Sequence, residues 1–132
     1  MSFAVMEGDP TTTGGFVLAA SASEVIDLRR VARMGDPVWC PVCKSVGFIA
    51  QGNPTWIDEC VAVATHGHQV QCGCASGSNQ LIASQEHFAA DMDAAIDIPE
   101  DQARQARWNA EQIAKAIKEG TYISPVLRPL SL

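Results

Sequence analysis

The sequence predicts a small, mainly β repeat domain of short strands, with a C-terminal α-helical extension. Three observations lead to this fold class. The chain repeats itself at an interval of 32 residues, cysteines stand at equivalent places in two of the repeated turns, and the composition changes after Ser84. A fixed interval of this size is typical of architectures in which each unit buries its apolar face against its neighbour.

Two glycine-containing turns carry the repeat. Sliding the chain against itself by 32 residues superposes Asp36 on His68 and Cys40 on Cys72, and the apolar positions upstream keep the same register. A degenerate first copy occupies residues 8–15, where Thr13 stands at the place of the two cysteines. We therefore expect three similar turns, of which two bear cysteine.

Short apolar runs separated by turn residues predict β-strands within residues 1–84. The runs at 16–20, 25–28 and 31–34 are short, with small turn residues between the first two, which favours strands over helices. The Gly-Asn-Pro segment at 52–54 predicts a turn between two further strands.

The composition after Ser84 is typical of helix, because alanine and charged residues dominate. Pro99 followed by two acids predicts a helix start, and Gly120 predicts its end, which gives a helix over about 99–119. We expect its apolar stripe to pack on the β body or on a partner. The stripe consists of Ala103, Ala106, Ala110, Ile113, Ala114 and Ile117.

These patterns divide the chain into a β-repeat domain at 1–84 and an extension at 85–132, whose tail beyond the helix is expected to dock as an extended segment. We expect removal of the extension to leave the β domain folded.

The charge pattern argues against nucleic acid as a partner. The chain has a net charge of −6 and no run of lysine or arginine, so it lacks the basic surface that binds a phosphate backbone. It also has no basic, apolar leader and no run approaching the ~18 apolar residues of a membrane span. These features predict a soluble cytoplasmic chain.

Four of the five cysteines form a Cys-x2-Cys and a Cys-x-Cys pattern, which favours metal ligation over a disulfide framework. A zinc-like ion takes four thiolate or imidazole donors in a tetrahedron. Cys40 and Cys43 are spaced to chelate from one turn, and either His68 with Cys72 or Cys72 with Cys74 completes the set. Such a site is structural, because no paired carboxylate or spare base stands beside these turns.

The fifth cysteine, Cys60, falls within the mixed apolar and polar pattern of a strand and is expected to be a small buried residue.

With these motifs in place, the chain resembles the PAAR-repeat family, the spike-tip proteins of bacterial type VI secretion systems. The resemblance covers about residues 5–84 and rests on the segments 8–15, 30–37, Cys40-Pro41, Gly67-His68 and Cys72-Gly73. It implies a small conical β domain pinned near its point by zinc. It also implies a wide base that sits on a trimeric VgrG-type β-helix spike, with one copy per trimer.

The resemblance also implies a ligand set. Family members take ligands from a histidine in the first Gly-Gly turn, a histidine soon after Cys-Pro, and the histidine and cysteine of the last turn. The first of these positions is Thr13 here, which departs from the pattern, and we expect Cys40 to take its place. The expected zinc ligands are Cys40, Cys43, His68 and Cys72, with Cys74 as the rival for the fourth position.

The function that the resemblance implies is structural: a spike tip that is not an enzyme, is exported to a target cell or the medium, and meets a membrane only on puncture. The extension at 85–132 is too short for an ordinary enzyme domain and is expected to cover the β body or to recruit an effector or adaptor. Two alternatives remain open, a free-standing zinc-binding interaction module and a small metallo- or thiol hydrolase.

Overall fold

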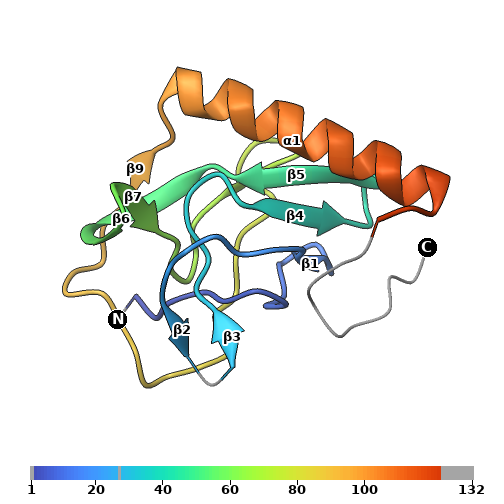
Figure 1. Ribbon diagram of the computed structural model, residues 1–132. Helices are drawn as coiled ribbons and strands as arrows, with labels where there is room; N and C mark the ends of the chain where they lie inside the picture. Colours follow the sequence, from blue (N-terminus) through green and yellow to red (C-terminus); the bar gives the residue numbers. More distant parts are fainter. Residues whose placement is uncertain (1, 27, 123–132) are drawn as a thin grey trace.

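A computed structural model of the protein describes residues 2–26 and 28–122 (Figure 1). Short strands form the body, and a helix lies along one side of it. In chain order the elements are β1 (Phe16–Val17), β2 (Val25–Ile26), β3 (Arg29–Arg30), β4 (Pro37–Cys40), β5 (Ser45–Ile49), β6 (Gln51–Asp58), β7 (Val61–Val63), β8 (Val70–Gln71), β9 (Ile96–Asp97) and α1 (Glu100–Glu119). The predicted mainly β fold with a C-terminal helix is confirmed.

The strands form three small antiparallel sheets. The largest has the order β1-β4-β5-β8, the second pairs β2 with β3, and the third has the order β7-β6-β9. Isolated bridges join the N-terminal segment to the later repeats, such as Ala4 to Thr65 and Met6 to Val31. Successive repeats are therefore linked by backbone pairing, as stacked units require.

The core is divided into several small clusters of aliphatic side chains. The central cluster combines residues from every repeat: Val5, Val17, Ala32, Val38, Ile49, Ala64, Val70 and Leu81. Small clusters of this kind leave the loops at the ends of the strands with little apolar support. Other interactions are needed to hold those loops together.

Helix α1 covers the face of the sheet that contains β4 and β5 (Figure 1). Phe48 packs against Ala103 and Ala106 near the start of the helix. Leu18 packs against Ile117 near its end. Of the predicted stripe, Ala103, Ala106, Ala110 and Ile117 are buried, and Ile113 and Ala114 are half-buried.

Gly120 ends the helix in the left-handed conformation, with φ of 74°. Both predicted ends of α1 therefore lie within a residue of those observed.

The predicted turn at 52–54 is wrong, because this segment lies inside β6. The pairing of β6 with β7 shifts register between Asn53 and Ile57, so an irregularity in the strand absorbs the turn residues. The Asn53 side chain accepts hydrogen bonds from the backbone N–H and the hydroxyl of Thr55. The local turn chemistry that the sequence indicates is thus present, but it bends a strand instead of ending one.

The expectation that Cys60 is buried is also wrong. Cys60 is exposed and forms, with Glu59, the turn between β6 and β7, where both residues have positive φ. Ile57 comes shortly before this two-residue turn and Val61 directly after it, so the sequence looks like a continuous strand.

Residues beyond Ser84 continue the fold of the body. Strand β9 pairs with β6, and α1 shares its two clusters with the sheet. The division into domains at 1–84 and 85–132 stays a prediction, and the expected extended tail lies outside the described residues. No helix among the described residues is both long enough and apolar enough to span a bilayer.

Candidate metal centre

The first two cysteines of the centre come from the hairpin that joins β4 to β5. Cys40 is the last residue of β4 and pairs with Ser45, so the residues between them form a tight turn. Lys44 in this turn has a positive φ of 52°. Cys43 is in the same turn, and the predicted chelating pair therefore comes from one short loop.

The other two cysteines, Cys72 and Cys74, follow β8, which pairs with β5. Their close approach to the hairpin requires glycine at two places. A Cβ at Gly47 would lie 2.2 Å from the carbonyl oxygen of Gln71, and one at Gly73 would lie 3.1 Å from the Cβ of Cys43. The absence of side chains at these positions brings the two cysteine-bearing loops together.

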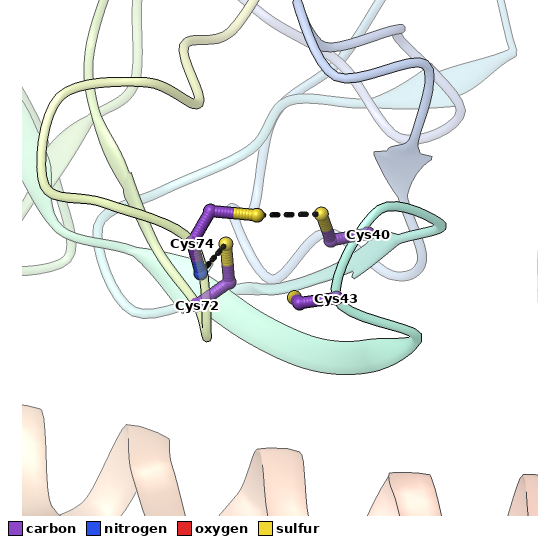
Figure 2. Close-up of side chains that lie close together, drawn as sticks. All are labelled: Cys40, Cys43, Cys72 and Cys74. Atoms are coloured by element: carbon purple, nitrogen blue, oxygen red, sulfur yellow. Dashed lines mark hydrogen bonds between the residues drawn. The ribbon is translucent and has the colours of Figure 1, made fainter.

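The four sulfur atoms form one compact group: the Sγ atoms of Cys40, Cys43, Cys72 and Cys74 all lie within 4.8 Å of one another. Figure 2 shows the four side chains turned toward a common space between the two loops. The Sγ atoms of Cys40 and Cys74 are 3.7 Å apart. A zinc ion with Zn–S bonds of about 2.3 Å needs sulfurs about 3.8 Å apart at the corners of its tetrahedron. The group therefore fits a tetrahedral ion after a small contraction.

Hydrogen-bond donors surround the sulfurs. The backbone N–H of Cys74 donates to Cys72 Sγ at 3.5 Å, and the side-chain amide of Asn79 donates to the same sulfur at 3.6 Å. The hydroxyl of Ser45 lies 3.1 Å from Cys43 Sγ. Donors of this kind stabilise thiolates and orient metal ligands.

The thiols differ in acidity. Burial opposes ionisation of Cys43, but hydrogen bonds from the Ser45 hydroxyl and the Cys40 thiol outweigh it and lower the pKa of Cys43 to about 6. Burial and the neighbouring Cys40 raise the pKa of Cys74 to about 12. Burial also raises the pKa of Cys72. Without a cation Cys72 and Cys74 hold their protons near pH 7, whereas a divalent ion would favour their thiolate form.

Three of the four ligands predicted from the sequence lie in this cluster, namely Cys40, Cys43 and Cys72. The fourth member is Cys74, which the sequence leaves as the rival, and His68 is not in the group. Thr13, at the place of the absent family histidine, lies beside the cluster with its hydroxyl 3.4 Å from Cys40 Sγ. The first repeat therefore reaches the site but offers it no imidazole.

Both ring nitrogens of His68 have other partners. Nδ1 accepts the backbone N–H of Thr65 at 3.0 Å, which requires a neutral ring with its proton on Nε2. Nε2 lies 3.0 Å from the carbonyl oxygen of Ala94 and donates to it. Burial lowers the pKa of His68 and keeps it neutral. His68 thus ties its own turn to the segment before β9.

These features define a class: a small protein of stacked β repeats whose adjacent turns share a closed cluster of four thiols. Residues 7–77, more than half of the chain, match the family profile of the PAAR motif. The chain belongs to the PAAR-repeat family of type VI secretion spike-tip proteins. Searches of curated proteins and of solved structures found no significant match.

Membership places the role of this chain, in general terms, at the tip of the type VI secretion spike. The family is structural, and its motif binds metal. The thiol cluster joins the cysteine-bearing turns of two repeats, and its four sulfur donors fit a metal ion.

Proposed function

We propose that the protein caps a trimeric VgrG-type spike, one copy per trimer, and that a zinc ion held by Cys40, Cys43, Cys72 and Cys74 stiffens the cap. The observation that carries this proposal is the convergence of two repeat turns on four sulfurs within 4.8 Å. Such an ion would join loops that have little core of their own, so its binding energy becomes folding energy. A cap that must withstand force needs this rigidity and needs no turnover.

The donor set supports zinc in a structural role. Four cysteine thiolates in a tetrahedron are typical of structural zinc, and such a set leaves no open position for a substrate. The Cys-x2-Cys chelate comes from one hairpin and the Cys-x-Cys pair from the neighbouring loop. Removal of the ion would therefore free both loops together.

The extension at 85–132 is proposed to carry or recruit an effector or adaptor, which fits export of the assembled tip by the secretion apparatus. Its helix keeps one face away from the sheet, and Trp108 on that face is 57% exposed. The β domain at 1–84 is proposed to contact the spike.

A pull-down with a purified spike trimer tests the capping role. The full chain loaded with zinc should bind at one copy per trimer, and the metal-stripped chain should bind much more weakly. Mass spectrometry of the intact complex gives the stoichiometry. A zinc-loaded, folded chain that fails to bind any VgrG-type trimer encoded alongside it would exclude this function.

A further inference from the structure

A cavity of about 640 Å³ lies between the β4–β5 hairpin and the C-terminal half of α1. Its apolar wall includes Trp39 and Pro41 from the hairpin side and Ile117 from the helix. The volume is in the range of sites that bind small ligands or bulky side chains. Ile117 is buried and Trp39 is half-buried, so the floor is set by packing within the fold.

Every lysine of the sequence lies at the rim of this cavity. The chain has three, Lys44, Lys115 and Lys118, and all three line the cavity. Each is exposed. Among residues 2–26 and 28–122, the side-chain ammonium groups of these three lysines have no ion-pair or hydrogen-bond partner. A chain with a net charge of −6 thus gathers its unpaired ammonium groups around one apolar hollow.

Four of the arginines, Arg29, Arg30, Arg33 and Arg107, have partners within the fold. Arg29 pairs with Asp9 at 2.8 Å, and Arg33 lies 3.7 Å from Asp58. The guanidinium of Arg107 is placed over the ring of Phe48. These groups are engaged within the structure, whereas the three lysines are free to meet an external anion.

Carbonyl groups at the C-terminal end of α1, which would repel an anion if left unpaired, accept backbone hydrogen bonds. The backbone N–H groups of Gly120 and Thr121 donate to the last turn and cap it. Lys118 in that turn further offsets the negative end of the helix dipole.

We infer that this cavity binds an acidic peptide segment of a cargo protein, with a bulky apolar side chain inserted between Trp39 and Ile117 and with flanking carboxylates on the three lysines. The inference rests on the proposed carrier role of the extension and names the site and chemistry of recognition. The apolar wall and the cationic rim together favour such a segment over a purely apolar one. The lysine ammonium groups gain ion-pair partners from the acidic segment and gain none from the apolar segment.

The hairpin that forms one side of the cavity also bears two of the four thiols. Cys43 is next to Lys44 in the chain, and Cys40 precedes Pro41. An ion on the cluster would hold this hairpin in place. Cargo binding should therefore be stronger in the metal-loaded protein.

The test uses two fluorescent ten-residue peptides with Trp-Leu at the centre, one flanked by aspartate and glutamate and the other by lysine. Fluorescence anisotropy with the zinc-loaded full chain should show binding of the acidic peptide only, weakened by salt. Charge reversal in the double variant K115E/K118E should weaken the acidic peptide at least tenfold. The matched control R104E reverses an exposed charge of the same helix outside the cavity and should stay within twofold.

Several results would overturn the inference. Equal binding of both peptides would reduce the cavity to a nonspecific apolar surface, and equal loss in R104E would indicate diffuse charge attraction. If the chain binds phosphatidylglycerol vesicles and does not bind the acidic peptide, the lysines contact a membrane instead. Peptide binding only after removal of residues 123–132 would make the chain's own tail the occupant. A chain that caps the spike but binds no peptide refutes this inference alone, whereas one that binds the peptide but not the spike refutes the capping role alone.

Discussion

Asp36 and His68 occupy the same place in successive repeats, and each accepts a hydrogen bond from the backbone N–H three residues earlier. The distances are 2.8 Å from Arg33 to Asp36 and 3.0 Å from Thr65 to His68. Asp9 does the same for Met6 in the first repeat, at 2.9 Å. A glycine with positive φ precedes each acceptor. His68 therefore acts as a turn cap in the manner of an aspartate, and its imidazole is committed to that role.

The first prediction follows from this commitment. Cys74→Ser should abolish stoichiometric zinc binding, because three sulfurs and a distant imidazole cannot complete the tetrahedron. His68→Asn should keep one zinc per chain, because the amide oxygen can still accept the Thr65 N–H. Elemental analysis of the purified variants gives the metal content.

Thermal unfolding provides the control for this pair. His68→Asn loses its bond to Ala94 and should cost on the order of 1 kcal/mol in both the loaded and the stripped protein. The reverse pattern, with zinc retained in Cys74→Ser and lost in His68→Asn, would restore His68 to the ligand set.

The second prediction concerns the pH dependence of metal binding. Near pH 7 the raised pKa values of Cys72 and Cys74 keep both protonated, and zinc must displace those protons. Binding should release at least two protons per ion, so the affinity should fall about a hundredfold for each pH unit of acidification. Calorimetry in buffers of different ionisation enthalpy measures the proton count. An affinity that does not change between pH 6.5 and 8 would rule out a four-thiolate site.

The third prediction concerns Asp36, whose pKa burial raises from 3.8 to about 6. The native state therefore holds the proton more tightly than the unfolded chain. The stabilisation from this carboxyl is complete below pH 4 and is lost as the pH rises through 6, by up to about 3 kcal/mol. Asp36→Asn should remove this dependence, because the amide keeps an acceptor for Arg33 and offers a donor to Ser21.

Urea unfolding between pH 4 and 7 measures the difference in the free energy of unfolding between the wild type and Asp36→Asn. The contribution of bound metal is the same in both proteins and cancels in this difference. Asp58→Asn is the matched control of opposite sign. Hydrogen bonds from Ser23 and the charge of Arg33 lower the pKa of Asp58, so its stabilisation is lost as the pH falls. A wild-type advantage over Asp36→Asn that grows between pH 4 and 6 would contradict the prediction.

The sequence predicts the parts of this fold that depend on local chemistry. The repeat interval, the cysteine-bearing turns and the ends of α1 follow from glycine, proline and cysteine at fixed places. The turn at Glu59 and Cys60 and the strand through Pro54 could not be predicted, because tertiary pairing of β6 with β7 decides them. The repeat alignment did hold a signal for His68, since its equivalent is Asp36, which is no soft-metal ligand.

The fourth prediction concerns the contribution of α1 to the β body. The helix covers Leu18 and Phe48, which are 0% and 2% exposed. Burial of each such side chain contributes roughly 1.5–3 kcal/mol. Removal of residues 98–132 should therefore cost about 5 kcal/mol in the free energy of unfolding, a large part of the stability of a small domain. Contrary to the expectation from the sequence that the β domain stays folded alone, the shortened chain should be largely unfolded unless zinc is bound.

Two single variants test whether the packed face of α1, and not its exposed face, contributes to the stability of the fold. Ile117→Ala removes a 9%-exposed side chain that contacts Leu18 and should cost about 2–4 kcal/mol. Trp108→Ala, on the exposed face, should change stability by less than about 0.5 kcal/mol. Urea unfolding of both variants in the zinc-loaded full chain is the measurement. Equal and small effects would mean that α1 rests on the sheet without supporting it, and residues 1–84 would then form an independent domain.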